Sequence, residues 1–302
     1  MNKRLGFTAL LSSALFYAFF GILIRYSSTS FGTFAQVVLR GLSATILILL
    51  WVLLRRKRLL VSPEVSKKRL ALYLLSPPIS MACATFSISL IKASNTVFFI
   101  YAGVIVSSLL FGWFFYRERV TVVKVLTFLI ALAGIFLMAF PLEKVGALGL
   151  IFGIIPGVLD SLSNAMAKYL GNFDKSTSIF LQSAATTIVG IVLFGLFGEV
   201  IPAHVSLASL TAVVTLGLLF VIINALYLYG FKNYDLNLGN IVISAELVIL
   251  LILNALFLGE FPSKNELFGG LLIVSAVVLI GVHTVYTEKQ NKIVPMQHLQ
   301  NA

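Results

Sequence analysis

The sequence predicts an all-α integral membrane protein whose ten transmembrane helices form two five-helix inverted repeats. The first observation is composition: of 302 residues, 59% are hydrophobic and 11% are charged, whereas a soluble protein carries about 25% charged residues. The second is a series of apolar stretches, each long enough to cross a bilayer. The third is a set of polar residues that recur 142 positions apart. Together they indicate one membrane-embedded domain.

Ten stretches approach the length of about 20 helical residues that ~30 Å of hydrocarbon requires. In chain order they cover residues 7–26, 33–54, 70–91, 96–116, 122–141, 147–167, 177–197, 208–230, 237–258 and 266–286. The first follows Lys3 and Arg4 and stays apolar to about residue 24, so we expect a retained span and not a signal peptide. Connections are short apart from "RRKRLLVSPEVSKKR", so function is expected among the helices.

The net charge of +11 is explained by topology. With a cytoplasmic N-terminus, 17 of the 22 Lys and Arg residues fall on the cytoplasmic side, three (Lys92, Lys144 and Lys264) fall on the other side, and Arg25 and Arg40 lie inside spans. Cytoplasmic loops of membrane proteins carry such an excess. We therefore expect a protein of the cytoplasmic (inner) membrane, with both termini in the cytoplasm and no nucleic-acid partner.

An internal repeat follows from comparing the two halves. "FFYRERVTVVKVLTFLIALAGIFL" resembles "LFLGEFPSKNELFGGLLIVSAVVLI", and this match aligns Glu118 with Glu260. The same offset pairs Asn95 with Asn237 and Arg40 with Gln182. Because five spans are an odd number, the second half enters the membrane from the opposite side. We expect one repeat over residues 1–143, another over 144–287 and a cytoplasmic tail over 288–302, with a substrate site where the repeats meet near the midplane.

A family resemblance rests on "LRGLSATILILL", "FFYRERVT", "ALAGIFL", "LFLGEFPS" and "GGLLIVSAVVLI". With the ten spans and the repeat, these segments resemble the EamA-type branch of the drug/metabolite transporter superfamily over about residues 7 to 286. The resemblance implies a transporter that works by alternating access; many members export amino acids or related compounds, and others import nucleotide derivatives or vitamins. Gln182 stands where the first half has Arg40, so a symmetric charge pairing is broken.

Arg40 is the first candidate for a substrate contact. A charged side chain near the bilayer centre costs roughly 2.5 to 3.5 kcal/mol, so such residues usually face the bundle interior. Arg40 lies about six residues, or ~9 Å, below the outer boundary. Three readings stay open there: snorkelling to the interface, an anchor for an anionic substrate group, and a structural pair with an internal carboxylate.

Two carboxylates are the next candidates. Glu246 falls in the middle of the ninth span, where it is expected to be buried, paired, hydrated or protonated. It could pair with Arg40 in one state, while a zwitterion such as an amino acid bridges them in another. Asp160 shares a helix face with Asn164, after the small-residue face of Gly149, Gly153 and Gly157. Asp160 is either an interface charge or a contact for a proton or an amine.

Uncharged polar groups complete the predicted site. Tyr17, Tyr101, Gln182 and Asn224 lie away from the span ends. Each alone is more simply a satisfied core residue, but together with the charged groups they outline an apolar cavity with a few polar contacts, as small-molecule sites have. Glu118 and Glu260 lie at membrane boundaries and are interpreted as helix-end or gating features, not as ligands.

The sequence therefore predicts a secondary transporter that moves a small polar or zwitterionic metabolite, an amino acid or related compound, outward by alternating access. The alternative is an importer or exchanger of a nucleotide derivative or vitamin, such as an S-adenosyl compound or riboflavin. A membrane enzyme is disfavoured because no catalytic constellation is found, and inverted repeats suit a channel less well. We expect no cofactor and no metal; the partners are the substrate, the lipid bilayer and, through Asp160 or Glu246, protons.

Overall fold

The molecule is a helical bundle, seen in a computed structural model that describes residues 2–91, 93–142, 146–200 and 204–300. The helices are α1 (Lys3–Ser27), α2 (Thr33–Leu54), α3 (Lys67–Leu90), α4 (Ala93–Tyr116), α5 (Val122–Ala139), α6 (Ala147–Leu170), α7 (Lys175–Leu196), α8 (Leu207–Asn233), α9 (Leu236–Ile243), α10 (Ala245–Leu258) and α11 (Lys264–Gln300). Within the described ranges, ten spans are long and apolar enough to cross a membrane, α9 and α10 together forming one of them. The predicted fold class is confirmed.

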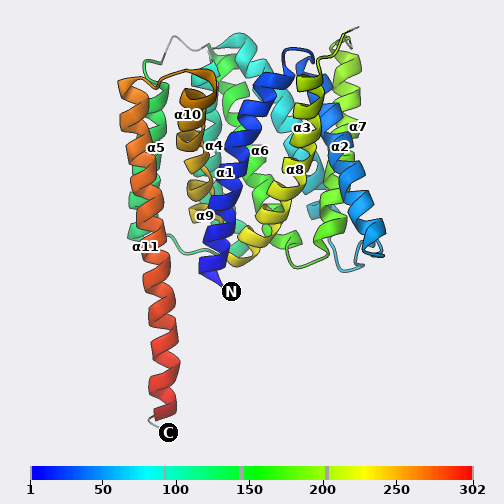
Figure 1. The fold of residues 1–302 in the computed structure, drawn as a ribbon. Helices are drawn as coiled ribbons and strands as arrows, with labels where there is room; N and C mark the ends of the chain where they lie inside the picture. Colours follow the sequence, from blue (N-terminus) through cyan, green and yellow to red (C-terminus); the bar gives the residue numbers. More distant parts are fainter. Residues whose placement is uncertain (1, 92, 143–145, 201–203, 301–302) are drawn as a thin grey trace.

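One predicted segment differs from the structure. The ninth span is expected to be one helix over residues 237–258, but it is interrupted at Ser244, whose hydroxyl donates to the carbonyl of Ile241 at 2.6 Å. Hydroxyl side chains compete for backbone groups in this way. Helix α11 extends to Gln300, so the predicted tail begins as a continuation of this helix (Figure 1). Lys92, Lys144 and the predicted boundary between residues 143 and 144 lie outside the described residues.

The helix boundaries follow the repeat. Helix α2 and helix α7 begin and end 142 residues apart, and so do the starts of α5 and α11. The ends of α1 and α6 are 143 residues apart, because the connection that follows is one residue shorter in the second half, at 171–174 against 28–32. Figure 1 shows α2 beside α7 at one edge of the bundle and α5 beside α11 at the other. Helices α3 and α6, and likewise α8 and α1, form the two related pairs between these edges.

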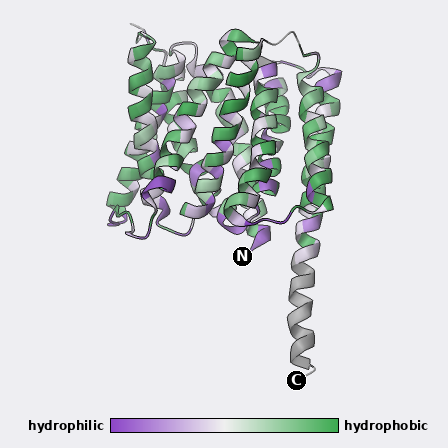
Figure 2. Ribbon diagram, turned by 180° about the vertical axis from the view of Figure 1, so that it is seen from behind, coloured by the Kyte–Doolittle hydropathy of each residue, from purple (hydrophilic) through white to green (hydrophobic). Residues whose placement is uncertain are grey.

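The bundle has two faces, one at each end of its helices. The N-terminus and the C-terminus lie on the same face (Figure 1), which is called the terminal side, and the opposite face is called the far side. Hydrophobic residues predominate along the helices between these faces, and hydrophilic residues gather at the helix ends and in the loops (Figure 2). Such a distribution is what a lipid-covered outer surface requires.

Close helix packing depends on the small-residue face of α6. A Cβ atom on Gly157 would lie 2.7 Å from the backbone nitrogen of Val104 and 2.9 Å from the Cα of Gly103, so α4 and α6 touch backbone to backbone here. Gly153 meets Phe99 of α4 and Gly149 meets Ile91 after α3 in the same manner. The predicted packing face is confirmed, and it holds α4 and α6 against each other beside the polar residues of α6.

Candidate functional site

A cavity of about 410 Å³ lies inside the bundle where the two repeats meet. Both repeats contribute to its wall, through helices α1 to α4 of the first half and α6 to α10 of the second. Its polar lining residues are Tyr17, Arg40, Tyr73, Ser80, Tyr101, Asp160, Ser163, Asn164, Gln182, Thr186, Asn224, Tyr227, Asn240 and Glu246. All eight residues expected from the sequence are therefore brought together around one space, and their role in substrate binding stays a prediction.

The Arg40 guanidinium is held on one wall by uncharged neighbours. Its Nη2 contacts the sulfur of Met81, and its Cζ lies 5.3 Å from the centre of the Phe20 ring. Its Nε is buried without a hydrogen-bond partner. A cation over an aromatic face is stabilised by the ring quadrupole, but this leaves most of the hydrogen-bonding capacity of the guanidinium unused. Arg40 is thus a positioned cation whose guanidinium has N–H donors available for further hydrogen bonds.

The suggested direct pair of Arg40 with Glu246 is not formed in this structure. Glu246 lies in the first turn of α10, just after the interruption at Ser244, and forms no hydrogen bond or ion pair with the part of the chain that the structure describes. A carboxylate in the first turn of a helix is favoured by the helix dipole. Glu246 therefore occupies a position at a helix start that suits an acidic side chain.

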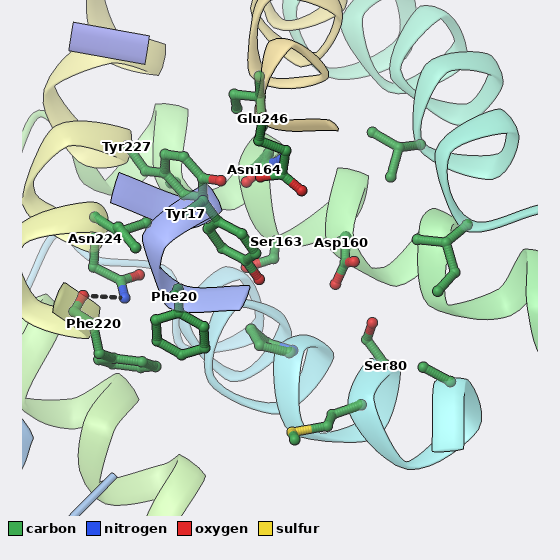
Figure 3. Close-up of a pocket in the computed structure, with 18 of the residues that line it drawn as sticks. Tyr17, Phe20, Ser80, Asp160, Ser163, Asn164, Phe220, Asn224, Tyr227 and Glu246 are labelled. Atoms are coloured by element: carbon green, nitrogen blue, oxygen red, sulfur yellow. Dashed lines mark hydrogen bonds between the residues drawn. The ribbon is translucent and has the colours of Figure 1, made fainter. Parts of the chain in front are cut away.

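Asp160 faces α3 across the cavity. Its carboxylate lies opposite the hydroxyl of Ser80 (Figure 3) and interacts with it. Ser80 donates its hydroxyl hydrogen to the carbonyl of Pro156 at 3.2 Å, so α3 is bonded to α6 one turn before Asp160. Tyr17 of α1 lies close enough to Asp160, Glu246 and Arg40 to interact electrostatically with all three. The ring of Tyr17 therefore stands at the centre of the charged groups.

The amide side chains of the cavity differ in how many of their hydrogen-bonding atoms have partners. Asn164 donates to the side-chain oxygen of Asn240 at 2.7 Å, and Asn224 donates to the carbonyl of Phe220 at 2.8 Å (Figure 3). Gln182 is buried and its Oε1 has no hydrogen-bond partner. Because a buried polar atom without a partner is costly, Gln182 is the amide best placed to gain from a ligand. Asn224 is mainly a structural residue in this state.

Some of the residues that line the cavity are not predicted from the sequence. Asn240, Ser80 and Tyr227 line the cavity but were not among the candidates. Asn240 could have been found, because it is an amide inside the apolar run "NIVISAELVIL", the same kind of signal that singled out Asn224. Ser80 and Tyr227 had no such signal, because hydroxyl groups are common in membrane helices and readily bond to their own backbone.

The predicted helix-end residues lie outside the cavity. Glu118 pairs with Lys168 on the terminal side and Glu260 pairs with Arg25 on the far side. Arg25 was placed inside a span without a partner, and Lys168 had no assigned role. The sequence offset identified the two glutamates as equivalent, but it could not identify the cations that lie beside them.

Inverted repeats of membrane-spanning helices around a largely apolar cavity with a few polar groups define the class of protein as a membrane transporter. The pattern of the EamA-like transporter family matches residues 4–140 and 147–282, and the chain belongs to this family. It is 22% identical over 178 residues to "Uncharacterized transporter YxxF" of Bacillus subtilis (strain 168). That match covers 57% of this chain and 56% of the relative, so it spans about half the length of each.

A solved crystal structure shares the fold. The TM-score is 0.78 at 16% sequence identity, over 95% of this chain and 98% of the other. At this identity the likeness concerns the arrangement of the helices alone. The class of protein is therefore established by the family and the fold, and the substrate must be argued from the cavity of this chain.

Proposed function

We propose that this transporter exports a small zwitterionic metabolite, an amino acid or a related compound, from the cytoplasm by alternating access. The supporting observation is the charge arrangement of the cavity: one guanidinium, Arg40, and two carboxylates, Asp160 and Glu246, line the same space without pairing with each other. A zwitterion offers a carboxylate to Arg40 and an ammonium group to the carboxylates. Arg suits the first contact because its planar fork matches a carboxylate.

The direction of export is defined by the orientation of the protein in the membrane, which is also proposed. The terminal side is taken as cytoplasmic, since most Lys and Arg residues lie in its loops, and the bilayer is taken as the cytoplasmic membrane. The repeats are proposed to run over residues 1–143 and 144–287, with residues 288–302 beyond the membrane. Substrate would then enter from the terminal side and leave on the far side.

Proton exchange is the proposed energy source. Asp160 and Glu246 are the groups that can take up a proton when the substrate amine leaves and release it when the amine returns, because a carboxylate without a partner is costly inside a membrane. In vesicles that contain the purified protein, substrate counterflow should then respond to an imposed pH gradient. Counterflow that ignores such a gradient would exclude proton exchange and leave facilitated transport.

A second candidate substrate follows from the excess of carboxylates. Two carboxylates against one guanidinium favour a ligand that carries one more positive group than negative groups. An S-adenosyl compound, with a carboxylate, an ammonium and a sulfonium, has this balance, and it would be imported or exchanged. A thermal-shift screen against amino acids, nucleotides, vitamins and S-adenosyl compounds separates these candidates, because a ligand of the native state raises its stability.

The site itself is tested by two substitutions. With the substrate found in the screen, Arg40→Gln and Glu246→Gln should each raise the substrate concentration needed for half-maximal counterflow by at least tenfold, since losing a charged hydrogen bond costs about 1.5 to 3 kcal/mol. Arg58→Gln and Glu64→Gln, exposed residues of the loop after α2, serve as controls and should transport like the wild type. Unchanged transport in both site variants would remove these two residues from the site.

A further inference from the structure

Two ion pairs occupy equivalent places in the two repeats, on opposite sides of the bundle. At the terminal side, Lys168 near the end of α6 lies 2.7 Å from Glu118, which follows α4. At the far side, Arg25 near the end of α1 lies 2.5 Å from Glu260, which follows α10. The glutamates are 142 residues apart and the cations 143 apart, the offsets found for their helices. The symmetry that exchanges the halves therefore exchanges the two pairs.

The two pairs differ in their surroundings. The side chains of Lys168 and Glu118 are 11% and 6% exposed, whereas those of Arg25 and Glu260 are 53% and 51% exposed. Glu118 also accepts hydrogen bonds from the backbone nitrogens of Leu236 at 2.7 Å and Asn237 at 3.4 Å, at the start of α9. A carboxylate is stabilised at a helix N-terminus. The terminal-side pair thus ties together the ends of α4, α6 and α9.

The equivalent far-side contact is absent. Glu260 does not bond to the backbone nitrogen of Asn95, which corresponds to Asn237, although both residues are described. Asn95 is 1% exposed, and neither its side-chain oxygen nor its side-chain nitrogen has a hydrogen-bond partner among the residues that the structure describes. In the terminal-side counterpart, the oxygen of Asn237 accepts from the nitrogen of Leu238 at 2.7 Å. At the start of α4 both polar atoms of the Asn95 amide are thus unsatisfied, whereas at the start of α9 only the amide nitrogen of Asn237 is, and Glu118 caps the helix.

Helix packing shows the same asymmetry. The end of α6 presses on α8, since a Cβ atom on Gly171 would meet the carbonyl of Leu228 and lie 2.9 Å from the Cβ of Lys232. The equivalent helices α1 and α3 form no contact of similar extent over their described residues. The bundle is thus packed together at its terminal side and less so at its far side.

We propose that the two pairs are alternating latches of the transport cycle. The Lys168–Glu118 pair closes the terminal side while the cavity faces the far side. In the opposite state this pair leaves the start of α9 and becomes exposed, as the Arg25–Glu260 pair is here, while α1 closes on α3 and Glu260 moves with Arg25 onto the start of α4 beside Asn95. Each state keeps one pair buried and leaves the other exposed, so the balance of states depends on the difference between the two pairs. The latches rest on the alternating access proposed above, but not on any particular substrate.

Spin-label distances test the latches without a substrate. On a Cys83→Ser background, labels at Ser28 and Leu90 report the far side between α1 and α3, and labels at Asn172 and Lys232 report the terminal side between α6 and α8. All four positions are exposed. The double variant E118Q/K168M should add a population with a longer terminal-side distance and a shorter far-side distance. Adding R25Q/E260Q to it should return both distributions toward those of the wild type.

A nearby ion pair provides the matched control. Lys124 of α5 lies 2.8 Å from Asp235 on the terminal side, and this pair has no equivalent in the other half, where Ala93 stands in place of Asp235. The variant K124M/D235N should lower the melting temperature without reciprocal changes in the two distances. If E118Q/K168M does not fold, Glu118→Asp, which shortens the side chain but keeps its charge, makes the same test.

Three results would contradict the proposal that the two ion pairs act as alternating latches. The first is unchanged distances in E118Q/K168M, or in Glu118→Asp where that variant replaces it. The second is a lengthening of both distances together, which would mean general loosening of the bundle. The third is the same reciprocal shift in K124M/D235N, because any weakening of the terminal side would then produce it. Transport that lacks a proton dependence or a zwitterionic substrate would refute the proposed function and leave these distances unaffected.

Discussion

Replacing Gly157 with alanine should force α4 and α6 apart. The new Cβ would lie 2.7 Å from the nitrogen of Val104 and 2.9 Å from the Cα of Gly103, and it would also meet the carbonyl of Ile100. Ordinary van der Waals contact begins at 3.4 Å, so the helices must separate by at least about 0.7 Å, the difference between 3.4 and 2.7 Å. These neighbours are backbone atoms, which cannot move aside by a change of rotamer.

The cost follows from overpacking. Inserting a methyl group into a well-packed interior costs about 1 to 3 kcal/mol of stability. A helical glycine without neighbours behaves oppositely, because alanine at such a position stabilises a helix by about 0.5 to 1 kcal/mol. Gly195 in α7 is such a position, with no atom within 4 Å of the place where the methyl group of an alanine would lie. The two substitutions are chemically identical and differ only in the space around them.

Melting curves of the purified protein in detergent provide the assay. Gly157→Ala should lower the melting temperature by roughly 2 to 12 °C, and Gly195→Ala should raise it or leave it unchanged. Transport should also fall in Gly157→Ala, because Tyr101 of α4 and Asp160 of α6 line the cavity on either side of this contact. Equal melting temperatures for Gly157→Ala and the wild type would refute the backbone contact between α4 and α6.

Two further predictions concern stability. Asn164→Leu leaves the side chain of Asn240 without the bond at 2.7 Å and should cost about 1 to 3 kcal/mol, with part of this recovered in N164L/N240L; equal melting of the single variant and the wild type would contradict it. Burial alone would raise the pKa of Asp235, but Lys124, Lys3 and Lys168 bring it below its ordinary value of 3.8. Because the folded pKa is lowered, this carboxylate stabilises the fold above pH 3.8, and its contribution is lost as the pH falls through the folded value. Asp235→Asn should therefore narrow the difference in melting temperature between about pH 6 and about pH 3, and an unchanged difference would refute the assignment.

Most of the fold could be predicted from the sequence because its signals are local. Apolar runs of membrane length and the polar residues that end them give the ten helices, and the recurrence of Glu118 as Glu260 gives the repeat. The interruption at Ser244 could not be predicted, since serine is usual in uninterrupted membrane helices. At Ser244 the side-chain bond to the carbonyl of Ile241 accompanies a break, and the sequence does not show which serine will do so.

The candidate cavity was predictable for a different reason. Charged and amide groups are expensive in lipid, so Arg40, Glu246 and Gln182 had to face the interior wherever the helices placed them. Their partners were not predictable: the contacts of Arg40 with Met81 and Phe20, and of Glu118 with Lys168, join residues far apart in the chain. Such pairings depend on helix rotation and tilt, to which hydropathy is blind.

The helix pairs at the two edges of the bundle have a particular place in this symmetry. Exchanging the halves turns α2 into α7 and α5 into α11, so each edge pair is mapped onto itself. The contact between α1 and α8 is exchanged with a different contact, the one between α6 and α3. A contact on the pseudo-twofold axis is exchanged with itself, so it can stay intact whichever side the cavity faces. The edges can therefore act as pivots on which the inner helices rock, and substitutions there should alter the stability of both states equally while leaving their ratio unchanged.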